Sequence, residues 1–332
     1  MVIKTEFSSR LLAGACLATL LFSGCMPRQS ADLIQNTPDK IAASAEIKGV
    51  PFFPQQDFQC GPASLAMALG HAGVEISPEQ LRPDLFIPDK RGTLQIEMMA
   101  VPRRYGLLAY PLKPQLSTIL QEINAGHPVI VFQNLGLSIA PQWHYAVVTG
   151  FDLTKQQMTL HSGNMADYHM SLPTFERTWV RAGSWARIVL PAGALPVDAE
   201  AKTYLHAVAG LEQSGLKEAS LKSYQAALNR WPENLTAWMG RGNSHYSLGN
   251  LDAAAMAFTK ASRHHPGATA PLNNLAQVRL EQGRYDEALS AIKRAVGLDS
   301  QSDTLQQTYT EIQKEAVKNK PVTGSIKKQQ GE

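Results

Sequence analysis

The C-terminal third of the chain repeats itself every 34 residues, and this register constrains the fold more than any other feature of the sequence. Gly215, Gly249 and Gly283 occupy the same place in three successive copies. The same register holds for two further sets: Ala227, Ala261 and Ala295, and Tyr224, Phe258 and Ile292. Such a period indicates stacked helix pairs, in which small residues let the two helices of a pair approach and larger ones fill the gap to the next pair. A generic helical bundle predicts no such register.

The middle copy resembles the tetratricopeptide repeat (TPR). The residues that carry the resemblance are Trp238, Gly242, Tyr246, Gly249, Ala254, Phe258, Ala261 and Pro266. It implies an all-α TPR solenoid with units at 201–234, 235–268 and 269–302, and we expect a polar capping helix to complete it at 303–317. The groove of such an array is expected to recruit a protein partner or substrate.

The first 24 residues predict a bacterial export signal. Lys4 and Arg10 precede an apolar stretch over 11–22, and small residues follow it. The ending "LFSGC" resembles the lipobox of bacterial lipoproteins, which implies a lipid on Cys25 that anchors the chain to a membrane; an ordinary secretory signal is the alternative. We expect residues 25–45 to form a tether. Because Met26 stands where inner-membrane retention would place Asp, the expected location is the cell envelope, at the outer membrane facing the periplasm.

The number of cysteines and the net charge of the mature chain limit the classes of function that it can have. Cys16 leaves with the signal and Cys25 carries lipid, so Cys60 remains as a single thiol and no intramolecular disulfide is possible. Removal of residues 1–24 takes two of 31 basic and one of 28 acidic residues, which leaves 29 and 27. A nearly neutral chain carries no electrostatic footprint of nucleic-acid binding. Cys60 is then a buried hydrophobe, a metal ligand or a nucleophile.

Between the expected tether and the repeats, the sequence predicts an α+β domain over residues 46–190. Its helical patterns come first, and four strand-like segments follow over the second half. That order argues for an antiparallel sheet and against alternating βαβ units. A Pro- and Gly-containing linker is expected at 191–200, and a disordered tail at 318–332.

Cys60 lies at the expected start of a helix, in the stretch "QCGPASLAMAL". The positive end of the helix dipole is expected to lower the pKa of such a thiol. Gly61 would allow a close backbone approach to substrate, and Pro62 presets the helical backbone. A nucleophilic thiol also needs a base, and the best candidate is His144 in "WHYAVVTGFD".

Together these two motifs resemble the bacteriocin-processing, double-glycine-leader type of papain-like cysteine peptidase, over residues 48–190. The resemblance implies a papain-like fold with Cys60 as nucleophile and His144 as general base and acid. It also implies an upstream glutamine that donates to the oxyanion, for which Gln55 is the first choice and Gln56 the second.

The family's third catalytic residue is an Asp, often before Pro, but this chain reads "LHSGNM" there, with Ser162 and Gly163 at those two positions. Asn164 is the expected orienter of the imidazole. His161 and Asp152 are the alternatives, although Asp152 also fits a hairpin turn.

The predicted function is therefore a lipid-anchored envelope cysteine peptidase that acts on a protein or peptide substrate and needs no cofactor. Three alternatives stay open. One is a non-catalytic scaffold that keeps a degenerate peptidase domain, and another is a Cys-His acyl transferase or deamidase. The third is a zinc site built from Cys60, His144, His161 and His169, although their spacing matches no common zinc motif.

Overall fold

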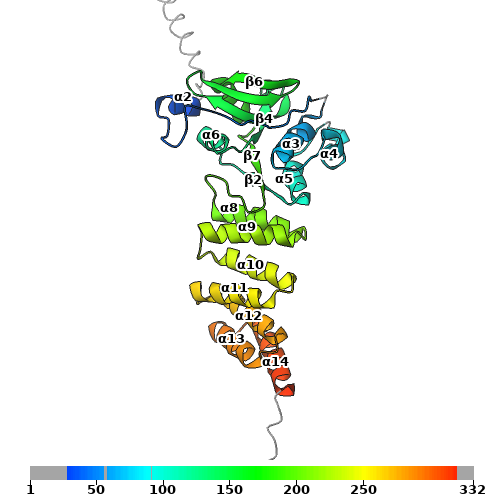
Figure 1. Cartoon of the computed structure of the whole chain (residues 1–332), viewed down its shortest axis with the longest axis vertical. Helices are drawn as coiled ribbons and strands as arrows, with labels where there is room; N and C mark the ends of the chain where they lie inside the picture. The colour runs from blue at the N-terminus through cyan, green and yellow to red at the C-terminus, as the bar shows by residue number, and fades with distance from the viewer. Residues whose placement is uncertain (1–27, 56–57, 91, 320–332) are drawn as a thin grey trace, which may run out of the picture. The chain divides into compact units, whose positions relative to one another are not determined.

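The computed structural model describes residues 28–55, 58–90 and 92–319, and the chain divides into two compact units (Figure 1). One unit contains the sheet and most of residues 28–190, and the other contains the helices after residue 199. The predicted signal peptide, Cys25, Gln56 and residues 320–332 of the predicted tail lie outside the described residues. In the part of the chain that is described, no helix is long and apolar enough to cross a membrane.

Helices of the sheet-containing unit mostly follow the predicted segments. Their bounds are α2 (Arg28–Gln35), α3 (Cys60–His71), α4 (Pro78–Leu85), the short 3-10 helix η1 (Pro88–Lys90), α5 (Gln95–Arg104), α6 (Leu116–Asn124) and α7 (Leu172–Val180). Residues 61–69 of α3 are all buried, so this helix forms the centre of the helical part. Helix α4 begins with a capping box, in which Ser77 Oγ accepts from the Gln80 N–H and Gln80 Oε1 accepts from the Ser77 N–H.

The sheet has the antiparallel character that the order of the segments predicted. Its strands are β1 (Ser44–Glu46), β2 (Leu107–Pro111), β3 (Val129–Asn134), β4 (Trp143–Asp152), β5 (Gln157–Ser162), β6 (Met165–Ser171) and β7 (Ala186–Pro191). The order is β2-β7-β3-β4-β5-β6, and β1 pairs with β4 as well. Sequence patterns predicted β3, β4, β5 and β7. They missed β1, β2 and β6. Strand β6, at one end of the order, is mostly exposed and has no apolar alternation.

The predicted tether is partly wrong, because residues 28–46 fold onto the sheet-containing unit. The buried Glu176 carboxylate of α7 accepts hydrogen bonds from the backbone N–H groups of Gln29 at 3.0 Å and Ser30 at 2.7 Å, in the first turn of α2. Gln29 Oε1 in turn accepts from the Leu116 N–H at the start of α6. A short polar helix has little stability alone, so these tertiary contacts account for an order that local sequence could not predict.

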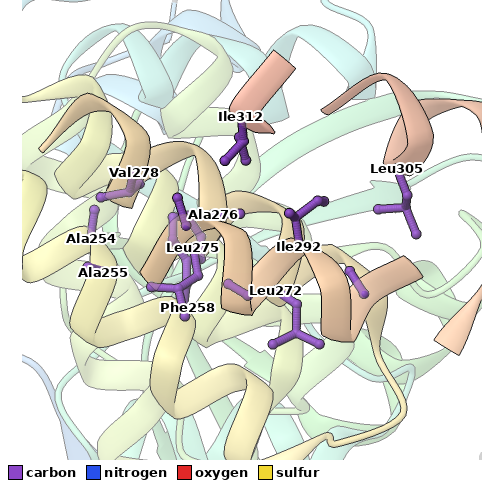
Figure 2. Close-up of a cluster of buried hydrophobic side chains, with 13 residues drawn as sticks. Ala254, Ala255, Phe258, Leu272, Leu275, Ala276, Val278, Ile292, Leu305 and Ile312 are labelled. Carbon is purple, nitrogen blue, oxygen red and sulfur yellow. The ribbon is translucent and has the colours of Figure 1, made fainter. Parts of the chain in front are cut away.

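The second unit is the predicted array of helix pairs with a final helix. Its helices are α8 (Ala201–Gln213), α9 (Lys217–Arg230), α10 (Leu235–Ser247), α11 (Leu251–His264), α12 (Thr269–Glu281), α13 (Tyr285–Leu298) and α14 (Asp303–Lys318). Figure 2 shows the buried side chains between successive helices, including Phe258, Leu272, Ile292 and Ile312. Close packing accounts for Gly242, since a Cβ there would lie 2.4 Å from the Phe258 ring. The repeated Gly215, Gly249 and Gly283 have positive φ angles of 77°, 76° and 69°, a backbone conformation that favours glycine.

Candidate active site

Cys60 is the first residue of α3 and lines a cleft of about 850 Å³. Burial raises the pKa of the Cys60 thiol, and hydrogen bonds from the backbone N–H groups of Tyr145, Gly61 and Cys60 offset this rise only in part. The helix start contributes in the expected direction, since the N–H groups of Cys60 and Gly61 lower this pKa, but the net shift is upward. Loss of solvation outweighs the helix dipole here, because a thiolate in a half-buried site gives up much of its hydration.

His144 lines the same cleft from the second residue of β4. Burial lowers the pKa of His144 to about 4, so the imidazole is neutral at neutral pH. Its Nε2 lies 2.9 Å from Ser162 Oγ. If Nε2 carries the proton and donates it to Ser162, Nδ1 is left as the basic atom of the ring.

The sheet register places Ser162 beside His144. His161 of β5 pairs with Val147 of β4, so continuing the register sets Ser162 opposite Ala146, on the same face as His144, which is two residues further along β4. The structure thus puts a hydroxyl against the imidazole at the position where the peptidase family has its Asp.

None of the three predicted orienters makes this contact with His144. Asn164 lies in the exposed turn between β5 and β6, because the strand has already ended at Ser162. Asp152 is at the opposite end of β4 and accepts from the Lys155 N–H at 2.9 Å, as a hairpin residue would. His161 lies on the other face of the sheet, where Nδ1 accepts from the Asp167 N–H at 3.3 Å and Nε2 contacts Val50 O at 3.4 Å.

Gln55 is placed in the cleft and is 9% exposed. Its backbone N–H donates to Gly163 O at 3.0 Å, and its Oε1 accepts from the Gly163 N–H at 3.2 Å. Its Nε2 lies 3.4 Å from both Ser64 Oγ and Tyr145 O, which is close to the limit of a hydrogen bond. If the pairing of β4 with β5 continued past Ser162, Gly163 would pair with Tyr145. Gln55 lies between these two residues and contacts both of them, so they do not pair directly.

Comparison with known families gives two matches. Residues 47–186 match the model of the Peptidase_C39 like family, and residues 210–262 and 241–303 match the tetratricopeptide repeat model. The chain has a peptidase C39-like domain followed by TPR repeats. The comparison with curated proteins gives no match.

Similar solved structures exist for both parts. A protein from Bacillus anthracis described as a C39-like peptidase is 18% identical with a TM-score of 0.38, over 44% of this chain and 97% of that one. The first TPR domain of Spaghetti bound to an HSP90 peptide is 14% identical with a TM-score of 0.34, over 35% and 93%. The type III secretion chaperone SycD of Yersinia enterocolitica, in complex with a YopD peptide, is 18% identical with a TM-score of 0.32, over 35% and 89%.

Within the peptidase C39-like domain, Thr93 holds the start of α3 against the cleft wall. A Cβ on Gly61 would lie 2.4 Å from Thr93 Oγ1 and 2.5 Å from Thr93 Cβ. Tyr145 Oη donates to Thr93 O at 3.3 Å, so the same residue also contacts the strand that carries His144. Gly61 was predicted to allow an approach of substrate, and the structure gives it a neighbour within the protein instead.

The described residues contain no group of three or more His, Cys, Asp or Glu side chains that could hold a metal ion. The zinc alternative would require His161 and His169 in the cleft with Cys60. His161 contacts Val50 and Asp167, and His169 Nδ1 lies 3.2 Å from Thr159 Oγ1. Their own contacts thus lie elsewhere in the domain.

Sequence reasoning missed two features of this site. Thr93 has no motif around it, and only the unusual Gly61 in a helical run pointed to a close neighbour. Ser162 stands where the resemblance expects Asp, but no local sequence signal shows that its hydroxyl would contact the imidazole.

Proposed function

We propose that this protein is a lipid-anchored cell-envelope cysteine peptidase whose TPR array recruits a protein partner or substrate. One observation carries the catalytic part of the proposal: Cys60 and His144 line one cleft, and Ser162 holds the imidazole through Nε2. The match to the Peptidase_C39 like family supports the same reaction class.

The direction of both pKa shifts favours a general-base mechanism over a preformed ion pair. Since burial raises the pKa of Cys60 and lowers that of His144, both groups are neutral before substrate binds. Nδ1 of His144 then takes the thiol proton as sulfur attacks the carbonyl carbon of the peptide. The Cys60 backbone N–H and Gln55 Nε2 are the proposed donors to the oxyanion.

The acyl-enzyme forms when the C–N bond breaks and His144 gives the same proton to the departing amine. Water then attacks the thioester, again with His144 as base, and releases the acid product and the free thiol. Ser162 keeps the ring in place throughout, but its neutral hydroxyl stabilises the transient imidazolium less than a carboxylate would. We therefore expect a slower enzyme than one with Asp at this position.

To test the reaction, the mature chain is incubated with unfolded envelope proteins, and new amino termini are identified by labelling and mass spectrometry. We expect wild type to create new termini, and both Cys60→Ala and His144→Gln to create none. Equal cleavage by wild type and Cys60→Ala would contradict the proposal. Conversion of glutamine to glutamate without chain cleavage would assign the same residues to deamidation, and Gln-to-Lys cross-links would assign them to transamidation.

A non-catalytic scaffold is a second candidate, and two specific observations favour it. Burial raises the pKa of Cys60, and the imidazole partner is Ser162 in place of an acid. In that case peptides would bind the cleft of wild type and of the Cys60→Ala variant equally well, and neither chain would form a product.

The proposed anchor is the lipid on Cys25, and a fractionation experiment tests it. Only two residues separate Cys25 from Arg28, the first residue of α2. We expect the wild-type chain to incorporate labelled palmitate and to sediment with membranes, and Cys25→Ala to do neither. Recovery of the Cys25→Ala chain in the membrane fraction would contradict a lipid anchor.

A further inference from the structure

We propose that Trp143 is the platform for a large apolar side chain of the substrate, on the leaving-group side of the bond that is cleaved. This inference rests on the proposed peptidase function and names the class of peptide that the cleft accepts. It assigns a specificity-determining role to a residue that takes no part in the chemistry.

Trp143 is both exposed and held in place. It lines the cleft together with Cys60 and His144, and 53% of its surface is open. Its ring stacks on Phe132, with centroids 5.3 Å apart and planes within 11°. A large aromatic surface left open in a cleft but fixed on one side is an apolar binding surface that is already ordered before the ligand arrives.

The support behind Trp143 extends into the core of the sheet. Phe132 contacts Tyr145, with ring centroids 4.6 Å apart, and Tyr145 meets the buried Trp185 edge to face at 5.6 Å. The Arg187 guanidinium lies 4.7 Å from the centre of the Trp185 ring. Phe132 and Tyr145 lie opposite each other in the β3–β4 register, so the strand pairing fixes the arrangement.

The charge of the cleft indicates which side chains it accepts. Lys90 is the one charged side chain among the described residues that line it, and none of these lining residues is Asp or Glu. Burial keeps His144 neutral, with a pKa of about 4. An apolar side chain of the substrate has no polar group whose desolvation would cost free energy, whereas a lysine or arginine would meet a positive charge and find no carboxylate.

The chemistry of the reaction decides on which side of the cleaved bond this side chain lies. The proton that releases the amine comes from His144, so the departing amine must lie against His144. Trp143 directly precedes His144 in β4. Successive side chains of a strand point to opposite faces, yet both residues line this cleft, so we place the side chain that contacts Trp143 among the residues that follow the cleaved bond.

The experiment uses a library of peptides prepared by digesting a bacterial proteome, which the mature chain then cleaves. For wild type we expect Phe, Leu, Met or Trp to be enriched in the first two positions after the cleaved bond, and Lys and Arg to be depleted. For Trp143→Ala we expect this enrichment to fall at least fivefold while cleavage still depends on Cys60. Trp143→Phe should keep most of it, because a phenyl ring can still stack on Phe132. Ile139→Ala is the matched control, since this 92% exposed residue is outside the cleft lining.

An unchanged preference in Trp143→Ala would overturn the proposal. If wild type cleaves nothing, the proposed function fails, and a binding experiment then tests separately whether Trp143 holds apolar side chains. Immobilised Cys60→Ala protein is then presented with the same library. If Cys60→Ala captures apolar peptides and Cys60→Ala/Trp143→Ala does not, Trp143 is a binding platform even in the absence of catalysis. If both variants capture the same peptides, the proposal for Trp143 is overturned.

Lys90→Glu tests the charge argument on its own. We expect this variant to accept Lys and Arg at positions that wild type excludes, with the apolar preference at Trp143 retained. Exclusion of basic residues that persists in Lys90→Glu would contradict the role of charge in the cleft.

Discussion

At the scale of single residues, the site is governed by desolvation. Burial raises the pKa of the Cys60 thiol and lowers that of the His144 imidazole, so both shifts favour neutral groups. Ser162 supplies a hydrogen bond to the ring without supplying charge. The reactivity of Cys60 should therefore respond strongly to a charge introduced at position 162.

Ser162→Asp tests this dependence. An ionised carboxylate next to the imidazole favours its protonated form, and we expect the pKa of His144 to rise from about 4 by roughly 1–3 units. The imidazolium then stabilises the thiolate, so Cys60 should be alkylated by iodoacetamide faster at neutral pH than in wild type. Wild type should react slowly at neutral pH and faster as the pH rises beyond the usual cysteine range. The rates are measured by mass spectrometry of the peptide that contains Cys60.

Ser162→Ala is the control for that comparison, because it removes the hydroxyl without adding charge. Rapid alkylation of wild-type Cys60 below pH 7 would show that the thiol is already ionised, and it would contradict the neutral pair.

Gly61→Ala tests the contact between the start of α3 and Thr93. The added Cβ would lie 2.4 Å from Thr93 Oγ1, so we expect a loss of roughly 1–3 kcal/mol in the free energy of unfolding and a loss of peptidase activity. Thr93→Gly in the same chain should restore part of the stability, because it removes the atoms that clash.

Urea unfolding followed by circular dichroism measures these changes. Gly92→Ala is the matched control, since the nearest atom to its added Cβ is 3.8 Å away. Equal stability of Gly61→Ala and Gly92→Ala would argue against the close contact.

At the scale of elements, the sequence predicts those helices and strands whose patterns are local, and it misses features that depend on contacts between distant residues. The "CGPASLAMAL" helix and the β-branched strands β3 and β4 carry their patterns locally, and both were predicted. The end of β5 at Ser162 could not be, because it depends on Gln55, which comes more than a hundred residues earlier and occupies the place beside Gly163. That strand end is what leaves Asn164 in an exposed turn.

Helix α2 shows the same limit at the N-terminal side. Its sequence is polar and short, and its order depends on Glu176 from the far end of the domain. A prediction follows for Glu176→Ala, which leaves the N–H groups of Gln29 and Ser30 without this acceptor. We expect a loss of about 1–3 kcal/mol in the free energy of unfolding.

Amide hydrogen exchange locates the effect of Glu176→Ala, since protection should fall first in residues 28–35. Glu176→Gln keeps one acceptor oxygen and should lie between the variant and wild type. Unchanged protection of α2 in Glu176→Ala would mean that other contacts hold this helix.

At the scale of the whole molecule, the chain combines a peptidase C39-like domain with a TPR array. The bounds of the repeat units in the array were predictable almost to the residue, because the same packing pattern occurs in three successive repeats. That Cys60 and His144 share one cleft could be predicted, but their electrostatic state could not, since the balance of burial and hydrogen bonds at Cys60 depends on atoms from β4.

Gly242→Ala tests the packing of the array. The new Cβ would lie 2.4 Å from the Phe258 ring, so we expect the array to lose roughly 1–3 kcal/mol of stability. Hydrogen exchange over α10 and α11 measures the loss. Gly267→Ala, whose added Cβ meets no atom within 4 Å, is the control that should leave protection unchanged. Equal protection in the two variants would contradict close packing between Gly242 of α10 and Phe258 of α11.

We propose that the Cys60 sulfur forms a covalent bond to a substrate carbonyl with His144 as its base. Reactions of the mature chain with peptide substrates, quenched in acid after a single turnover, test it by intact mass and by mapping of the modified peptide. We expect a thioester between a substrate fragment and Cys60 in wild type, and none in Cys60→Ala or His144→Gln. Peptide cleavage that proceeds with no adduct on Cys60, or that persists in Cys60→Ala, would contradict it.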